Sequence, residues 1–308
     1  MEAEERKEIA IISAKGLGDG LLTMVIAYNL HLLGHRVHFL SDILLPLKSF
    51  FPDVPILNFP ERDVFPQIIG DYTIVCCADG ILPEGLQHKR NANVFVLDRD
   101  RQRRDIHYVE SFAQQFDAFY ACAFKTQENG MKMPIEHHYR KNVRRVCIHP
   151  TSKDEVKNWD QAKFVALAKK LICDGWEPVF TLKKEELKFW QCLSKEGLKY
   201  VCLPLDALAV FIYESGFMIA NDSGPGHLAS NMGIPLLSIF RKQSTAVMWG
   251  PLWGASRVVA PAFRFPGRQG TRYWRSFLSV RRVYNAFNAL THAVRLADHE
   301  RAEQTAAC

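Results

Sequence analysis

Short apolar runs alternate with longer amphipathic patterns along nearly the whole chain of 308 residues. Each run has the length of a buried strand, and the segments between the runs repeat their apolar residues every three or four positions, as helices do. Parallel strands need crossover connections of this length, and strands covered by helices on both faces are apolar throughout. The alternation therefore predicts an α/β fold built on parallel sheets.

The apolar runs predict five strands in each half of the chain. They are 9–13, 37–40, 55–58, 73–77 and 94–97 in the first half, and 145–148, 178–181, 200–202, 217–220 and 235–239 in the second. Among the helical patterns, residues 21–33 follow the first strand, and residues 160–173 begin at a capping Asp160.

The pattern weakens only in the polar stretch 127–144, which contains a glycine and a proline. We place the domain boundary there and predict an N-terminal domain over residues 1–140 and a C-terminal domain over residues 141–308. The strand–helix alternation in both halves predicts two Rossmann-like, doubly wound domains that face each other across a cleft. We expect ligands in that cleft, at the carboxyl ends of the strands.

The net charge of +6 is unevenly distributed. Residues 223–297 contain no acidic residue but ten basic ones, so the remainder of the chain is net acidic. In part of this segment, between Phe263 and Arg282, arginines mix with aromatic residues. That mixture occurs in nucleic-acid sites and at membrane surfaces. We favour an anionic, lipid-linked partner and expect no nucleic acid.

The sequence predicts neither a signal peptide nor a membrane-spanning helix. The first eight residues are acidic and lack the basic start of a signal peptide. The most apolar long window, residues 201–220, is interrupted by Asp206 and Glu214. We therefore expect a cytoplasmic protein.

The first motif is Lys15-Gly16-Leu17-Gly18-Asp19-Gly20, between the first strand and the first helix. It matches neither the dinucleotide fingerprint nor a P-loop, because Leu21 replaces the third glycine and no G-K-[ST] follows. A carboxylate at a helix N-terminus is stabilised in its charged form, which suits a general base. Asp19 is therefore a candidate base, and a plain N-cap aspartate is the alternative.

The second motif runs from Asn221 to Ala229 and opens a helix with small residues, Ser223-Gly224-Pro225-Gly226. The free N–H groups of a first helical turn form a ready anion site. His227, one turn into the helix, can hydrogen-bond a phosphate or a sugar. The alternative is a helix cap by Asp222 or Ser223 with His227 as a packing residue.

The third motif, His149 to Trp159, follows the first strand of the second half and offers hydroxyls and two lysines. This layout suits the neutralisation of a phosphate, whereas a solvated charged loop is the alternative reading of the same residues.

Together these motifs resemble the three signatures of the ADP-heptose:lipopolysaccharide heptosyltransferase family, which are GT-B glycosyltransferases. The resemblance rests on Gly18-Asp19, on Lys157-Asn158-Trp159, and on Asn221 to Ala229 followed by Gly233 to Phe240, in the family's order. It spans roughly residues 8–260.

The resemblance implies an inverting, metal-independent transfer of heptose from ADP-heptose, without a cofactor, to an anionic glycolipid such as the lipopolysaccharide inner core. It also implies a C-terminal helix that crosses back to the N-terminal domain. The stretch of arginines and aromatic residues suits peripheral contact with the inner face of the cytoplasmic membrane. The implied catalytic residues are Asp19, as the base, and Lys157, which neutralises the leaving diphosphate. The implied nucleotide-sugar-binding residues are Gly18, Thr151, Ser152, Asp222, Ser223, Gly224, His227 and either Glu185 or Glu186.

Asp98-Arg99-Asp100 spells a D-x-D motif, the metal-holding pattern of another glycosyltransferase fold. Because so short a motif is common by chance, we expect no metal there. The neighbouring arginines are candidates for contact with the anionic acceptor, with a solvated loop as the alternative; they are Arg99, Arg101, Arg103 and Arg104.

Other functions stay open at this point. A GT-B chain can use another nucleotide sugar or a protein acceptor, can be a nucleotide-sugar epimerase, or can be a scaffold that binds nucleotide sugar without catalysis. The presence of Asp19, Lys157 and His227 together argues against the scaffold.

Overall fold

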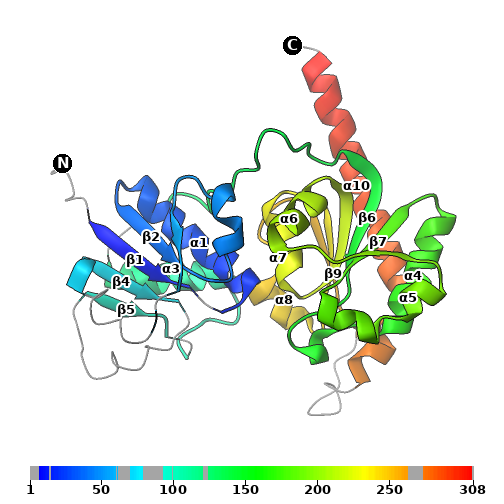
Figure 1. The fold of residues 1–308 in the computed structure, drawn as a ribbon, viewed down its shortest axis with the longest axis horizontal. Coiled ribbons are helices and arrows are strands. Elements are labelled where there is room, and N and C mark those ends of the chain that lie inside the picture. The colour runs from blue at the N-terminus through cyan, green and yellow to red at the C-terminus, as the bar shows by residue number, and fades with distance from the viewer. Residues whose placement is uncertain are drawn as a thin grey trace. The chain divides into compact units, whose positions relative to one another are not determined.

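The computed structural model describes residues 7–13, 15–59, 61, 70–78, 93–98, 100–120, 124–262 and 273–306. The chain forms two compact units, residues 1–134 and 135–308 (Figure 1). This division lies six residues before the boundary that the sequence predicts.

Unit 1 is a parallel sheet in the order β3-β2-β1-β4-β5. The strands are β1 (Glu8–Ile12), β2 (Arg36–Leu40), β3 (Ile56–Leu57), β4 (Ile74–Cys77) and β5 (Val94–Val96). The helical elements for which the described residues give bounds are α1 (Leu17–Leu32), the 3-10 turn η1 (Leu45–Phe50) and α3 (Tyr108–Phe119). After β1 the chain adds β2 and β3 on one side of that strand, and then β4 and β5 on its other side. The topological switch point therefore lies between β1 and β4.

Helix α1 begins at Leu17, four residues earlier than the sequence predicts. The sequence interpretation assigned Gly18 and Gly20 to the turn, but both are buried within the helix. A Cβ at residue 20 would stand 3.2 Å from Ser13 Oγ and 3.3 Å from Leu44 Cδ1. The glycine at position 20 therefore serves close packing of the helix start.

Unit 2 is a parallel sheet in the order β11-β10-β9-β6-β7-β8. The strands are β6 (Asn142–His149), β7 (Glu177–Thr181), β8 (Lys199–Val201), β9 (Ser215–Asn221), β10 (Leu236–Ile239) and β11 (Ser256–Val259). The α-helices with bounds in the described part of this unit are α4 (Gln161–Cys173), α5 (Cys192–Lys195), α6 (Leu205–Tyr213), α7 (Gly224–Asn231), α8 (Gln243–Trp249) and α10 (Val280–Ala306). The 3-10 turns are η3 (Glu155–Lys157), η4 (Lys184–Phe189) and η5 (Trp274–Phe277).

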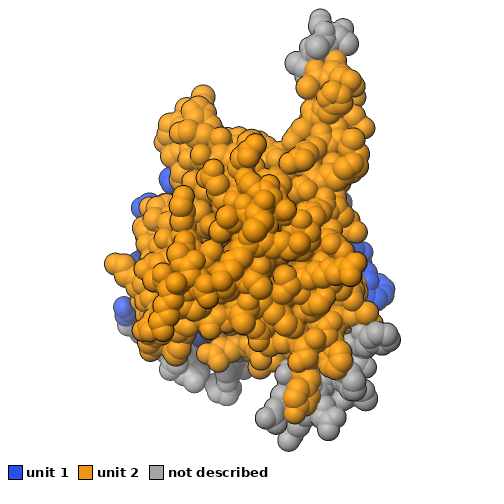
Figure 2. Space-filling view, turned by 90° about the vertical axis from the view of Figure 1, so that its right-hand side faces the viewer, with its two compact units in different colours: residues 1–134 blue, residues 135–308 orange. Residues whose placement is uncertain are grey.

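Helices cover both faces of the second sheet. Helices α4 and α10 lie on one face, and α6 and α7 lie on the other (Figure 1). Helix α10 joins the core of its own unit through an apolar stripe, which is Val283, Phe287, Leu290 and Val294. Its last turns stand out from the body of unit 2 (Figure 2). The expected crossing of this helix to the N-terminal domain stays a prediction.

All ten expected strands are present, within a few residues of their expected limits. The sequence interpretation missed β11, an edge strand of which only Val259 is buried. Over the described residues, no helix combines the length and the apolar character needed to cross a bilayer.

Candidate active site

The topological switch point of unit 2 lies between β6 and β9, which are neighbours in the sheet. The connections that follow these two strands lead away to opposite sides of the sheet, and ligands of doubly wound folds bind where such connections separate. The second and third motifs are these two connections. The fold therefore brings together at one sheet edge two segments that lie about 65 residues apart in the sequence.

The connection after β9 leads into α7, whose N-cap is Ser223 with extended backbone angles. Ser223 makes no capping bond, and its Oγ, in a residue only 8% exposed, has no hydrogen-bond partner among the described residues. Gly224 and Gly226 present first-turn N–H groups that have no acceptor within the helix, and Pro225 has none to offer. A buried hydroxyl and free N–H groups at one helix start form a binding site for an anion.

Lys157 supplies a positive charge to this helix start. Its Nζ lies 2.8 Å from Asp222 Oδ2, so the lysine of the third motif and the aspartate of the second form an ion pair. The Asp222 side chain is 7% exposed and the Lys157 side chain 38%, so the ammonium is the partner that solvent or a ligand can reach.

Asn221 ties the two connections together. Its Oδ1 accepts from the backbone N–H of Trp159 at 3.1 Å, and its Nδ2 donates to the carbonyl of Pro150 at 2.6 Å. Asn221 is fully buried, so these bonds are shielded from water. The motif alone indicates no role for Asn221, whereas the structure shows that it holds the third motif against the second.

The hydroxyl pair of the third motif has two different environments. Ser152 Oγ donates at 2.7 Å to the carbonyl of Asp154 or to Asn158 Oδ1, so it shapes its own loop. Thr151 is buried beside His149, with its Oγ1 3.5 Å from the His149 Nε2. Of the two predicted residues, Thr151 belongs to a buried polar network.

His149 is the centre of that network and was not singled out from the sequence. Its Nδ1 lies 3.0 Å from the carbonyl oxygen of Thr181 and 3.1 Å from the Thr181 Oγ1. Burial lowers the pKa of His149 to about 4, against a weaker opposing effect of the Glu186 carboxylate. The imidazole is therefore neutral at neutral pH and locks the ends of β6 and β7 together.

Glu185 and Glu186 both lie in η4, after β7. The Glu186 Oε2 accepts from the backbone N–H of Lys183 at 2.8 Å, and its charge acts on His149. Glu185 is exposed. Glu186 is thus the acid that the structure associates with the His149 network, although its predicted contact with a nucleoside remains untested.

Asp19 lies in unit 1, in the first turn of α1, which follows β1 at that unit's switch point. Its carboxylate folds back over Gly16: a Cβ at residue 16 would stand 2.4 Å from Asp19 Oδ2. The N-cap position belongs to Gly16, so Asp19 is not the N-cap residue that the alternative reading proposed. The positive end of the helix stabilises the ionised carboxylate, as a base requires.

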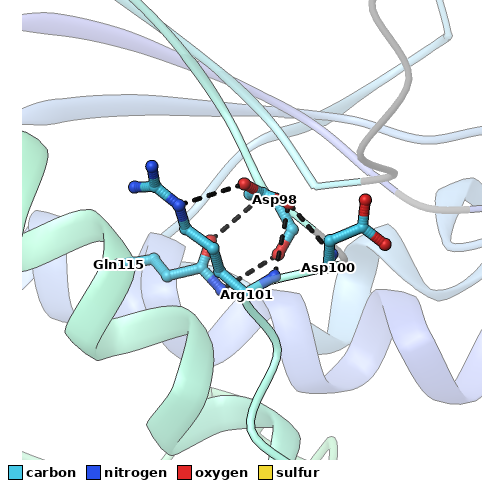
Figure 3. Close-up of polar contacts among 4 residues, drawn as sticks. All are labelled: Asp98, Asp100, Arg101 and Gln115. Carbon is cyan, nitrogen blue, oxygen red and sulfur yellow. Dashed lines mark hydrogen bonds and ion pairs between the residues drawn. The ribbon is translucent and has the colours of Figure 1, made fainter.

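The two aspartates of the D-x-D motif have different surroundings (Figure 3). The Asp98 Oδ1 accepts from the backbone N–H groups of Asp100 and Arg101, and the Asp98 Oδ2 pairs with Arg101 Nε at 3.2 Å. The Gln115 Oε1 accepts from the Asp98 N–H, and the Gln115 Nε2 donates to the Asp98 carbonyl. The Asp100 carboxylate points away from Asp98. Among the described residues, no three His, Cys, Asp or Glu side chains gather as metal ligands.

The arginines beside this motif differ in their surroundings. Arg101 pairs with Asp98, and Arg103 forms a two-pronged ion pair with Asp105 at 3.1 and 2.6 Å. Arg104 is exposed, and Arg99 lies outside the described residues. Contact of these arginines with an acceptor stays a prediction.

Two parallel α/β units, each with a helix start at its switch point, define the class of GT-B proteins. The chain belongs to glycosyltransferase family 9 (heptosyltransferase), whose sequence model matches residues 86–262.

The chain is also similar to lipopolysaccharide heptosyltransferase 3 of Escherichia coli, at 31% identity over 117 residues. That match spans 34% of this chain and 33% of the relative, so it covers about a third of the length of the curated protein.

Among solved structures, a glycosyl transferase family 9 protein from Veillonella parvula superposes with a TM-score of 0.74. The two share 16% identity, over 93% of this chain and 98% of that one. The E. coli ADP-heptose LPS heptosyltransferase II superposes with a TM-score of 0.71 at 16% identity, over 94% and 99% of the two chains. At these identities the likeness establishes the GT-B fold.

Proposed function

We propose that this protein is an inverting, metal-independent glycosyltransferase that moves heptose from ADP-heptose to an anionic glycolipid, such as the lipopolysaccharide inner core. The observation that carries the proposal is the start of α7, where a buried, unpartnered Ser223 hydroxyl and free N–H groups lie beside the Lys157 ammonium. Membership in a family described as heptosyltransferases supports the choice of sugar.

In this proposal the diphosphate of the donor occupies the α7 start. The N–H groups of Gly224 and Gly226 and the Ser223 hydroxyl donate to phosphate oxygens, with His227 one turn further in. The Lys157 ammonium turns from Asp222 toward the phosphates and offsets the charge that develops as the bond from the sugar to the diphosphate breaks. Leaving-group stabilisation by fixed donors and a lysine needs no metal ion.

Asp19 acts as the general base. As the acceptor hydroxyl oxygen attacks the anomeric carbon, the carboxylate takes the hydroxyl proton, and the ADP departs from the opposite face with the bonding electron pair. A single displacement of this kind inverts the anomeric configuration. The support from this chain is the position of Asp19 in the first turn of α1, where the helix favours the ionised carboxylate.

The proposed acceptor is anionic because exposed arginines lie beside the D-x-D loop, and because the relatives are described as acting on lipopolysaccharide. The same acceptor would bring the protein to the inner face of the cytoplasmic membrane as a peripheral protein.

The deciding experiment is a calorimetric titration of ADP, UDP and GDP into the wild type, Lys157→Ala and Lys153→Ala. Lys153 is exposed in the same loop and serves as the matched control. We expect ADP to bind most tightly, and the loss of Lys157 but not of Lys153 to weaken it about tenfold. Equal binding of the three nucleotides would refute the ADP donor, and equal affinity in both variants would refute the role of Lys157.

Turnover with ADP-heptose and a lipopolysaccharide inner-core acceptor, with and without EDTA, completes the test. Transfer that survives EDTA agrees with the proposal, whereas its abolition would refute metal independence. Tight ADP binding without transfer to any acceptor would favour the non-catalytic scaffold.

A further inference from the structure

We propose that Trp274 and Arg275 are positioning residues that fix the loop carrying Lys157, and so aim its ammonium at the diphosphate. This inference rests on the proposed role of Lys157. The two residues belong to the arginine-rich, aromatic stretch, for which the sequence suggested contact with an acceptor or a membrane. They also lie beyond residues 86–262, the segment that the family's sequence model matches.

Two consecutive side chains hold three backbone carbonyls of the Lys157 loop. The Arg275 Nε donates to the carbonyl of Asn158 at 2.5 Å, and its Nη2 donates to the carbonyl of Glu155 at 2.6 Å. The Trp274 Nε1 donates to the carbonyl of Val156 at 2.9 Å. The carbonyls before and after Lys157 are therefore fixed by side chains that lie almost 120 residues further along the chain.

The middle of the loop depends on such bonds because residues 152–158 bury no side chain. None of the residues of η3 is buried, and Val156 is 37% exposed. Its internal bonds are short-range: Asp154 caps the N–H of Val156, and the Lys157 N–H donates to the carbonyl of Asp154. A turn that buries no side chain opens at little cost unless something outside it holds it closed.

We call the Trp274 and Arg275 side chains the clamp. The clamp is attached to the core of unit 2. Trp274 is 3% exposed and belongs to the main core. Lys163, on α4, donates through Nζ to the carbonyls of Arg275 and Leu278 at 2.5 and 3.1 Å. The Trp159 Nε1 also donates to the carbonyl of Leu278 at 3.0 Å. The clamp thus fixes an exposed loop to the core.

The Lys157 ammonium also pairs with Asp222, in the connection between β9 and α7. Asn221 bonds that connection to Trp159, at the end of the Lys157 loop. The ammonium is therefore oriented from two directions, by the ion pair with the α7 connection and by the clamp behind the loop. A guanidinium suits this task because the Nε and Nη2 of its planar fork donate to two carbonyls in a fixed geometry, whereas an ammonium carries its donors on a single atom.

The test is a double-mutant cycle read as ADP affinity by calorimetry, with urea unfolding to monitor the fold. The variants are Arg275→Ala, Arg275→Lys and Trp274→Phe, each alone and combined with Lys157→Ala. Arg281→Ala is the matched control, because Arg281 is an exposed arginine of the same stretch. Trp274→Phe removes the N–H donor and part of the ring volume but keeps an aromatic ring in the core, so it tests the clamp even if an Arg275 variant folds poorly.

We expect Arg275→Ala and Arg275→Lys to weaken ADP binding on the order of tenfold, Trp274→Phe to weaken it less, and Arg281→Ala to leave it unchanged. In the Lys157→Ala background the same changes should have less than about a twofold effect, since the residues act through Lys157.

Restoration of affinity by Arg275→Lys would overturn the role of the guanidinium fork, because a single ammonium would then be enough to hold the loop. Full additivity with Lys157→Ala would overturn the clamp itself. Wild-type affinity in all the clamp variants, with a loss in Lys157→Ala, would refute the clamp and leave the proposed function standing. Wild-type affinity in Lys157→Ala would refute the proposed role of Lys157 itself.

Discussion

Lys157 and Asp222 form an ion pair, 2.8 Å from Nζ to Oδ2, in which the carboxylate is buried and the ammonium is partly in solvent. The two halves of such a pair are not equivalent. Loss of the lysine leaves a charge in the protein interior, whereas loss of the aspartate leaves a charge that water can solvate.

This asymmetry predicts unequal stabilities. Lys157→Ala should lower the free energy of unfolding by about 1–3 kcal/mol, and Asp222→Asn by less than about 1 kcal/mol. Urea unfolding at neutral pH measures both, and Lys153→Ala, in the same loop, should be neutral. Equal losses in the two variants would show that Asp222 is not effectively shielded from solvent.

Asp19→Asn should lower turnover by about 10²–10⁴-fold while ADP affinity stays within twofold, because the base acts on the acceptor hydroxyl and not on the nucleotide. The amide keeps the size of the side chain, so the fold is preserved. Comparison of kcat with the ADP affinity separates the two effects. Near wild-type transfer by this variant would eliminate Asp19 as the base.

Protonation of His149 predicts a pH-dependent stability. Burial lowers its folded pKa to about 4, below the value near 6.5 of an unfolded chain. Below about pH 6.5 the unfolded state therefore binds a proton that the folded state rejects, so this stability is complete above pH 6.5 and is lost as the pH falls toward 4.

Between pH 7 and pH 5 the wild type should lose about 2 kcal/mol more unfolding free energy than His149→Asn. Asparagine keeps a donor near the Nδ1 position, toward the Thr181 carbonyl, but does not titrate. Urea unfolding at the two pH values checks the difference. The same pH dependence in both proteins would mean that His149 is protonated as easily when folded as when unfolded.

The sequence predicted the elements whose signal is local. Ten strands and the Asp160 cap of α4 follow from short-range patterns, and the Asp160 side chain does accept from the Lys163 N–H. Strand β11 was not predicted, because an edge strand with a single buried residue lacks the apolar run that marks the other strands. The early start of α1 was not predicted, because Gly20 has a packing role against Leu44 that the local sequence does not reveal.

The site was predictable only in part, for the same reason. The helix start at Ser223 and the candidate lysine could be identified from motifs, but their partners could not. The pairing of Lys157 with Asp222, the link from Asn221 to Trp159 and the hold of Arg275 on the loop all join residues 62 to 120 positions apart. No local pattern encodes such contacts, because they arise only when the strands are ordered in the sheet.

Gly16 offers a way to move the Asp19 carboxylate without changing its chemistry. The backbone of Gly16 has φ −101° and ψ 143°, which alanine adopts without strain. A Cβ there would stand 2.4 Å from Asp19 Oδ2, so Gly16→Ala must displace the carboxylate. Because a displacement of about 1 Å can cost about 10²-fold in rate, turnover should fall by that order while ADP affinity is unchanged.

Two further variants make this prediction decisive. Gly70→Ala is the control, since a Cβ at residue 70 meets no atom of the described residues within 4 Å, and it should retain full turnover. In the Asp19→Asn background, Gly16→Ala should cause little additional loss, because the base that it displaces is already absent. If Gly16→Ala alone transfers sugar at the wild-type rate, the position of this carboxylate over the helix start is irrelevant to the reaction. Asp19 would then have to be replaced as the candidate base.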